Sequence, residues 1–474
     1  MIRLRAVLVC AVVLAAGTGC GGDEPAPRHP TAGKPADRPD PGDFNGDGYD
    51  DFLGFVQSAP KNGVMGTSTL VVVHGSKKGL NPAWATRIRP AKGEEFGPPP
   101  LRADLDKDGF TDVVASSGTD LAQARTFAMF GGPRGLGAAR LLDLPAGFRP
   151  LAAADFDGDG SVDLLDGGRR GPGSGWPRTD GALLYGPFDR TGTPRRQVAL
   201  DLSQHGYSTP QSAVTGDFDG DHRAEVVLTY SYDAEQDDAA PSGLYNVASY
   251  EGGERGLVRD TRQESRISRA VSTPGGPRTP AVGDADGDGT DDLLLPTRLI
   301  VAPADLPKTG GALTILYGAR SGLGTGRRET VIGNRDTDQR RVDFGASPAV
   351  GDVNGDHRPD VVVDIPDFRR HDGRVTLLPG GPDGVPSAAG EQSVDAGTKG
   401  LPGTPNPYYW NAFNYEPPLL DVDGDGHADA VVFAPLYEKR KGAFVVLRGT
   451  DAGFDPKRAQ LFTPDDLGTA QRLP

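Results

Sequence analysis

Residues 284–295 read Asp-Ala-Asp-Gly-Asp-Gly-Thr-Asp-Asp-Leu-Leu-Leu, a nine-residue acidic loop that runs directly into an apolar stretch. The same pattern, D-x-[DN]-x-D-[GH]-x-x-[DE], occurs seven times in the chain. The copies, numbered loop 1 to loop 7 in chain order, begin at Asp43, Asp104, Asp155, Asp217, Asp284, Asp352 and Asp421. Neighbouring starts lie 51 to 69 residues apart. A period of this size is typical of a repeat architecture.

The residues of loop 5 favour a hard cation with oxygen ligands. Asp284, Asp286 and Asp288 offer side-chain oxygens at positions 1, 3 and 5, Thr290 offers a backbone carbonyl at position 7, and Asp292 offers a carboxylate at position 9. With water, these atoms supply the roughly six to eight oxygens that calcium takes. Glycine at position 6 lets the chain turn sharply, because it adopts positive φ without steric cost.

The other six loops repeat these ligand positions, so we expect up to seven structural calcium ions. Their ligand sets are Asp43, Asn45, Asp47, Tyr49 and Asp51; Asp104, Asp106, Asp108, Phe110 and Asp112; Asp155, Asp157, Asp159, Ser161 and Asp163; Asp217, Asp219, Asp221, Arg223 and Glu225; Asp352, Asn354, Asp356, Arg358 and Asp360; and Asp421, Asp423, Asp425, His427 and Asp429. His222 and His357 replace the glycine of loops 4 and 6, and Asn354 removes a charge. We therefore expect loops 4 and 6 to bind most weakly.

An EF-hand is excluded because it needs a glutamate at position 12 and a helix on each side. Here the residues after position 9 are apolar and largely β-branched, as in 360–363 and 429–432. Such runs, bounded by Gly, Pro and Asp, predict strands. The alternative to calcium is a set of acidic surface turns that bind no ion.

The chain is predicted to be all-β. Each repeat carries a second motif, an apolar strand followed by a glycine turn, as in Leu-Thr-Ile-Leu-Tyr-Gly at 313–318. The spacing leaves room for four short strands in each repeat. This predicts a seven-bladed β-propeller of four-stranded blades, with a calcium loop in each blade, over residues 42–474. The tail at 468–474 resembles the strand that leads into the other loops, so we expect it to complete the first blade and close the ring.

The N-terminal residues predict export. Residues 1–20 combine Arg3 and Arg5, an apolar run and small residues before Cys20, as in a signal peptide with a lipobox-like end. Cys20 is then the lipidated first residue of the mature protein, and plain secretion is the alternative. Residues 21–41 are polar and proline-rich, which indicates a flexible tether. We expect a secreted protein, anchored to the cell membrane only through its lipid and facing the exterior.

The formal charge of −15 is largely accounted for by the loops. One divalent ion in each of the seven loops would add fourteen positive charges and bring the net charge to about −1. A nucleic-acid partner is not expected, because the sequence has no basic stripe to neutralise phosphates. A monomer is expected.

The acidic loop and the glycine turn together resemble the FG-GAP or VCBS-type repeat, which forms the seven-bladed propeller of integrin α subunits. The "GAP" part is eroded to Ser-Ala-Pro at 58–60 and Phe-Ala-Pro at 433–435, and the chain has no Arg-Gly-Asp tripeptide. The resemblance implies calcium in the loop between the first and second strands of each blade, on one face of the disc. It implies ligand contacts on the opposite face.

Tyr408, Tyr409, Trp410 and Tyr415 form an aromatic cluster that the resemblance assigns to the opposite face. Tyr and Trp offer an apolar body with a polar tip, which suits carbohydrate stacking or a protein partner. The alternative is a plug that packs against the neighbouring blade.

No catalytic residues are predicted, because the histidines outside the tether and loops lack metal or triad spacing and the common nucleophile and phosphate-binding motifs are missing. We expect a non-catalytic binding, adhesion or scaffolding module on the bacterial cell surface. A polysaccharide lyase or hydrolase on the same scaffold is the alternative, because glycoside hydrolysis needs only two carboxylates.

Overall fold

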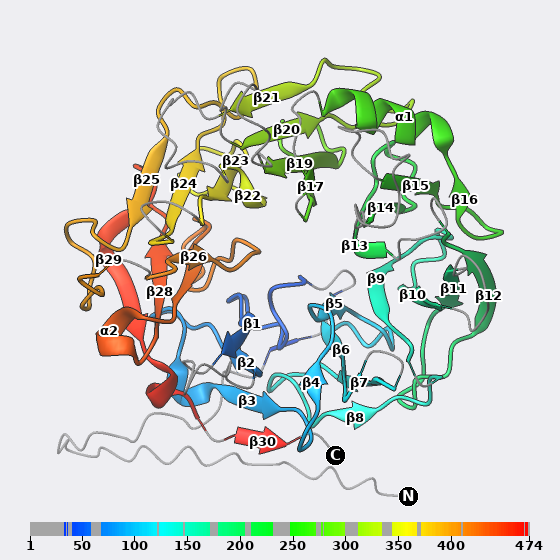
Figure 1. The fold of residues 1–474 in the computed structure, drawn as a ribbon, viewed down its shortest axis with the longest axis horizontal. Coiled ribbons are helices and arrows are strands. Elements are labelled where there is room, and N and C mark those ends of the chain that lie inside the picture. Colours follow the sequence, from blue (N-terminus) through cyan, green and yellow to red (C-terminus); the bar gives the residue numbers. More distant parts are fainter. Residues whose placement is uncertain are drawn as a thin grey trace, which may run out of the picture.

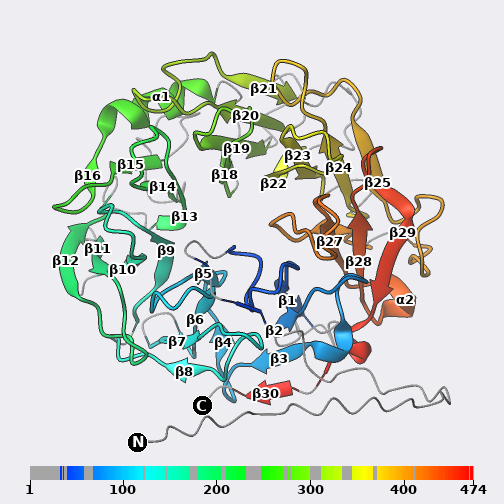
Figure 2. The same ribbon diagram turned by 180° about the vertical axis from the view of Figure 1, so that it is seen from behind.

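Seven small sheets form a ring around a central axis (Figure 1), and the view from behind shows the same closed arrangement (Figure 2). The protein is thus a seven-bladed β-propeller, and the predicted fold class is confirmed. This computed structural model describes residues 33–34, 36, 40–57, 68–120, 123–145, 147–170, 179–203, 210–230, 247–271, 276–277, 279–298, 311–333, 344–366, 371–408, 411–468 and 470–472.

The blades follow one another in chain order. Blade 1 holds β1 (Phe52–Gln57), β2 (Ser68–Val73), β3 (Thr86–Arg89) and β30 (Ala470–Arg472). Blade 2 holds β4 (Glu95–Phe96), β5 (Leu101–Ala103), β6 (Asp112–Gly118), β7 (Arg125–Met129) and β8 (Arg140–Leu141). Blade 3 holds β9 (Pro150–Ala154), β10 (Asp163–Arg170), β11 (Thr179–Tyr185) and β12 (Arg196–Asp201). Blade 4 holds β13 (Pro210–Gly216), β14 (Glu225–Tyr230), β15 (Val247–Glu251) and β16 (Val258–Arg259).

The remaining three blades repeat the plan. Blade 5 holds β17 (Gly276–Pro277), β18 (Ala281–Gly283), β19 (Asp292–Arg298), β20 (Ala312–Leu316) and β21 (Thr330–Gly333). Blade 6 holds β22 (Ala346–Gly351), β23 (Asp360–Asp364), β24 (Arg374–Leu378) and β25 (Gln392–Asp395). Blade 7 holds β26 (Asn414–Tyr415), β27 (Ala430–Ala434), β28 (Ala443–Arg448) and β29 (Asp455–Phe462). In blades 2 and 5 the innermost strand is split in two, because β4 and β5 both pair with β6, and β17 and β18 both pair with β19.

Helical segments lie outside the sheets. Helix α1 (Thr261–Ala270) follows β16 at the rim, and the Asp260 side chain accepts a hydrogen bond from the Arg262 amide at its start. Helix α2 (Tyr437–Arg440) is one irregular turn, and short 3₁₀ turns span Pro82–Trp84 and Pro464–Asp466. Among the described residues, no helix is long and apolar enough to cross a membrane.

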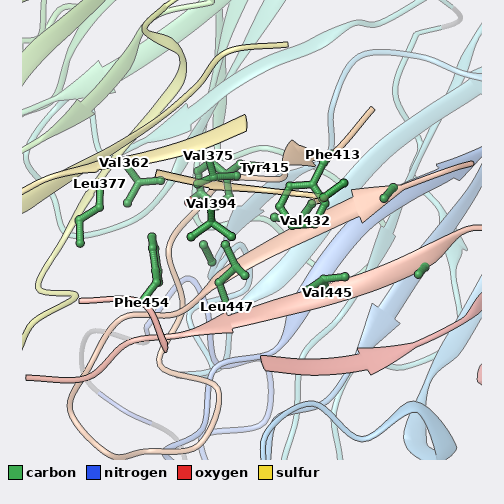
Figure 3. Close-up of a cluster of buried hydrophobic side chains, with 14 of the residues drawn as sticks. Val362, Val375, Leu377, Val394, Phe413, Tyr415, Val432, Val445, Leu447 and Phe454 are labelled. Carbon is green, nitrogen blue, oxygen red and sulfur yellow. The ribbon is translucent and has the colours of Figure 1, made fainter. Parts of the chain in front are cut away.

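The second and third strands of blades 2 to 7 are largely buried on both faces, which explains their apolar and β-branched composition. All five residues of β23 and all five of β27 are buried. Figure 3 shows the cluster between blades 6 and 7, where Val362, Val375 and Leu377 meet Val432 and Val445. Neighbouring blades therefore share one apolar layer, and this layer holds the ring together.

The C-terminal tail joins blade 1, but at the opposite edge from the one predicted. β30 pairs in parallel with β3, with Arg87 opposite Ala470 and Arg89 opposite Arg472, at the outer rim (Figure 1). The prediction that the tail forms the inner strand leading into loop 1 is therefore wrong. In the described part of the chain β1 is the innermost strand of blade 1, and the Arg102 guanidinium from blade 2 donates to its Leu53 carbonyl (3.2 Å).

Part of the predicted tether lies against the disc. The amides of Gly33, Lys34 and Ala36 donate to the carbonyls of Pro133, Gly46 and Gly109. Gly33 lies so close that a Cβ there would be 2.0 Å from the Asn45 carbonyl oxygen. The chain is therefore in contact with loops 1 and 2 before residue 42.

We predict that Phe444→Ala lowers the free energy of unfolding by about 3–5 kcal/mol, the usual cost of removing a buried phenylalanine. Phe444 is fully buried, and its ring lies 4.9 Å from those of Phe433 and Phe462 and 5.6 Å from that of Phe52 in blade 1. Urea unfolding measures the change. Val331→Ala, at a half-exposed position of β21, is the control, and equal losses in the two variants would contradict the shared apolar layer.

Candidate functional site

The acidic loops lie at one face of the disc. In blades 2 to 7 each loop joins the first strand to the second, as loop 5 joins β18 to β19, and loop 1 leads directly into β1. Consecutive strands are antiparallel, so all first-to-second connections emerge on the same side. We call this side the acidic face.

The seven loops share one internal hydrogen-bond pattern. The position 6 amide donates to a carboxylate oxygen of position 1 at 2.7–2.9 Å in every loop. The position 7 amide donates to the position 5 carboxylate at 2.8–3.2 Å. His222 (φ 68°) and His357 (φ 62°) adopt the left-handed conformation that glycine has elsewhere, for example Gly289 (φ 88°). Loops 4 and 6 therefore keep the turn, at a steric cost that glycine avoids.

The carboxylate at position 9 connects the two repeated motifs. In loop 5 one oxygen of Asp292 accepts the amide of Gly318 in the glycine turn (2.8 Å), and the other accepts the amide of Ala285 in the loop (2.8 Å). The bond from the glycine turn recurs at 2.7–2.9 Å in blades 1, 2, 3, 6 and 7. The bond from the loop amide recurs at 2.7–3.2 Å in loops 1, 2, 3, 4 and 6. We call this arrangement the carboxylate bridge.

Backbone hydrogen bonds also join neighbouring loops around the ring. The position 8 amides of Asp50, Ala224, Asp291 and Ala428 donate to the position 1 carbonyls of the preceding loops, Asp421, Asp155, Asp217 and Asp352. The residue after the glycine turn donates to a position 2 carbonyl in the preceding loop, as Ser76 does to Val422 and Ala319 to Phe218. The acidic loops thus form a hydrogen-bonded belt that includes the junction between blades 7 and 1.

Burial makes the charged form of the bridge carboxylates costly. It raises the pKa of Asp112, Asp163 and Asp292 to about 7 and that of Glu225 to about 8, and neighbouring loop carboxylates add to the shift. Burial raises the pKa of Asp429 too, and the guanidinium of Arg448 acts in the opposite direction. A bound cation would remove most of this cost.

Several loops bring three carboxylates together with oxygens within 4.8 Å of one another. The groups are Asp104, Asp106 and Asp108; Asp155, Asp157 and Asp163; Asp217, Asp219 and Glu225; Asp284, Asp286 and Asp292; and Asp421, Asp423 and Asp425. Loops 1 and 6 have Asn45 and Asn354 at position 3.

The position 3 carboxylates carry the clearest sign of a missing partner. One oxygen each of Asp106, Asp157, Asp286 and Asp423 is buried and has no hydrogen-bond partner among the described residues. Buried polar atoms are nearly always satisfied, so four equivalent exceptions point to a common ligand. Carboxylate oxygens at positions 1, 3, 5 and 9 with a carbonyl at position 7 form a donor set that fits calcium.

The other residues predicted to be functional do not share one environment. Tyr408 is 83% exposed, in the connection from β25 to β26 that emerges on the face opposite the acidic loops. Tyr415 is only 2% exposed and lies in the cluster between blades 6 and 7 (Figure 3), so it is a core residue and not a surface contact as predicted. Its amide donates to the buried carboxylate of Asp364. Tyr409, Trp410 and Cys20 lie outside the described residues.

One segment of the chain matches a known family of repeats. Residues 344–378 match the FG-GAP repeat. The matched stretch begins Phe-Gly-Ala-Ser, the least eroded form of the name-giving motif in the chain, and it contains loop 6. Sequence reasoning identified this repeat by its acidic loop and overlooked the motif at 344–347.

Most of the chain is also similar to two solved structures. One, "Structure of Dos1 propeller", has a TM-score of 0.42 at 10% identity and covers 87% of this chain and 81% of that chain. The other, "Crystal structure of exotype rhamnogalacturonan lyase YesX", has a TM-score of 0.26 at 12% identity, with coverage of 92% and 84%. Both TM-scores are low, so neither match carries an argument about activity.

We predict that Asp292→Asn destabilises the protein by about 1–3 kcal/mol even without calcium, because an amide replaces a carboxylate that accepts two buried backbone N–H groups. Asp288→Asn, at the exposed position 5 of the same loop, is the matched control. It should leave the calcium-free protein nearly unchanged and weaken only its stabilisation by calcium. Urea unfolding in chelator and in calcium separates the two effects, and equal behaviour of both variants would contradict the bridging role.

We predict that the calcium-free protein is more stable at pH 5.5 than at pH 8. The pKa of the bridge carboxylates is raised from about 4 in the unfolded chain to about 7, so between these values the native state holds more protons and stability falls as pH rises. Calcium binds the ionised form and should remove this dependence. Unfolding midpoints at both pH values, with and without calcium, test this. A calcium-free protein that gains stability toward pH 8 would contradict it.

Proposed function

We propose that this protein is a calcium-stabilised extracellular β-propeller that acts as a non-catalytic binding or scaffolding module at the bacterial cell surface. The observation that carries the calcium part is the set of buried, unpartnered oxygens at position 3 of loops 2, 3 and 5. Ions in these loops would neutralise carboxylates whose charged form burial disfavours. They would stabilise the belt that joins the blades.

The calcium is proposed to be structural. In loop 5 the position 9 carboxylate already accepts two backbone amides, and the position 1 and 5 carboxylates accept amides of the turn. An ion there would complete an existing frame. Extracellular modules of this kind bind calcium at roughly 10⁻⁴–10⁻³ M, which suits a protein that works outside the cell. Lipidation at Cys20 would hold the disc at the membrane.

The opposite face is proposed to contact the ligand. Around blades 6 and 7 its loops are joined to one another: the Asn411 side chain donates to Asp372, the Thr404 amide donates to Glu438, and the Tyr437 hydroxyl donates to the Pro402 carbonyl. This frame presents the exposed ring of Tyr408. An exposed aromatic ring suits stacking on a sugar or anchoring of a protein.

Calcium should raise the melting temperature of residues 21–474. An ion that binds only the native state at ten times its Kd adds ~1.4 kcal/mol for each site. Differential scanning fluorimetry in chelator and in 1–10 mM calcium, about the range of the affinities expected, measures the shift. Magnesium at equal concentration is the control, and an identical melt in calcium and in chelator would refute the metal assignment.

Binding of the calcium-loaded protein to a panel of cell-wall and plant polysaccharides tests the ligand part. Tyr408→Ala should weaken binding roughly tenfold or more, a loss of about 1.4 kcal/mol that is typical of an aromatic contact. Val258→Ala, an exposed apolar residue on β16 at the rim, should bind like the parent. Equal binding by all three proteins would refute a site at Tyr408. Release of sugar products would favour the polysaccharide-acting alternative.

A further inference from the structure

The residue that precedes the glycine turn occupies an equivalent place in every blade. In blades 1, 2, 3, 5, 6 and 7 the glycine that follows it donates to the position 9 carboxylate, so this residue lies beside the candidate ion site. In blades 1 to 7 it is His74, Phe130, Tyr185, Glu251, Tyr317, Pro379 and Arg448. Blade 7 alone has a permanently charged cation here.

Arg448 directs its guanidinium into loop 7. Its Nη1 donates to Asp429 Oδ2 at 2.6 Å and lies 3.2 Å from Asp423 Oδ2. Asp423 and Asp429 are positions 3 and 9. In loops 3, 4 and 5 the carboxylates of positions 1, 3 and 9 form the candidate calcium group, whereas in loops 2 and 7 the group consists of positions 1, 3 and 5. Of these two loops, only loop 7 has a guanidinium on its position 9 carboxylate. The guanidinium thus takes up the position 9 carboxylate that a calcium ion would need.

The guanidinium is also enclosed by blade 1. Its Nη2 donates to the Lys78 carbonyl at 3.1 Å, and a Cβ on Gly79 would lie 1.7 Å from the same atom. The Arg448 side chain is only 6% exposed. Arg448 therefore joins the carboxylates of blade 7 to the backbone of blade 1, at the junction where the ring closes.

Other arginines near the loops are placed differently. Arg327 contacts the position 3 carboxylate of loop 5, through Asp286 Oδ2 at 2.8 Å, and also donates to the Asp383 carbonyl of blade 6 at 3.2 Å. Its side chain is 37% exposed. Arg190 and Arg195 contact positions 3 and 5 of loops 2 and 3 from similarly exposed positions. These partly exposed side chains can swing into solvent when an ion binds, whereas the Arg448 side chain is buried between blades 7 and 1.

We propose that Arg448 is a built-in cation that takes the place of calcium in loop 7, so that the junction between blades 7 and 1 holds without the ion. The inference rests on the proposed calcium binding by the other loops. The unpartnered Asp423 Oδ1 does not restore the site, because a divalent ion there would lie close to a guanidinium that cannot lose its charge.

The test is the number of calcium ions bound, measured by isothermal titration and equilibrium dialysis on residues 21–474. Asp288→Asn and Asp425→Asn remove the same position 5 carboxylate from loops 5 and 7. Asp288→Asn should lose one ion, and Asp425→Asn should lose none. Loss of one ion in Asp425→Asn would overturn the proposal.

A second pair of variants tests the arginine itself. Arg448→Gln should gain one calcium ion, whereas Arg327→Gln should keep the parental number and bind it more tightly. If the parent protein binds no calcium, the proposed function fails by itself. The Arg448→Gln variant still decides this inference, because one ion gained supports it and none overturns it. If Arg448→Gln does not fold, the Asp425→Asn count decides.

Discussion

The fold depends on the buried carboxylate at position 9 of each acidic loop. In blades 1, 2, 3, 5 and 6 it accepts one backbone N–H from its own loop and one from the glycine turn of the same blade, as Asp292 does with Ala285 and Gly318. The first and third strands of the blade are thereby fixed relative to each other at the acidic face. Because such a charge is costly to bury, the same residue that orders the blade also creates a demand for a cation.

We propose that this demand is met in two ways around the ring. In loops 2, 3 and 5 the position 3 carboxylate keeps an unpartnered buried oxygen, which suits an ion taken from solution. In blade 7 a guanidinium supplied by the chain lies between positions 3 and 9. Blade 1 has a milder version, with the His74 Nδ1 at 2.9 Å from Asp51 Oδ2. The two blades with a basic side chain beside the position 9 carboxylate are blades 7 and 1, which meet where the ring closes.

The sequence allowed the number of blades and the places of the acidic loops within them to be predicted, because both follow from a motif repeated in register. It did not reveal the edge at which the tail pairs, since Ala470–Arg472 suits an inner or an outer strand equally well. The burial of Tyr415 was also missed, because an aromatic in a proline-rich loop gives no sign of whether it faces solvent or core. The sequence shows only that an arginine precedes the glycine turn of blade 7. Its contacts with the loop 7 carboxylates and with the backbone of blade 1 became apparent from the structure.

The most direct test of the account is a crystal structure of calcium-loaded protein with anomalous diffraction to locate the ions. The account predicts peaks in loops 2, 3 and 5, about 2.3–2.6 Å from the oxygens of Asp106, Asp157 and Asp286 that now lack partners. Arg190, Arg195 and Arg327 should have moved away from them. Well-ordered loops without such peaks, with the arginines still paired to the carboxylates, would contradict the claim that calcium completes these loops.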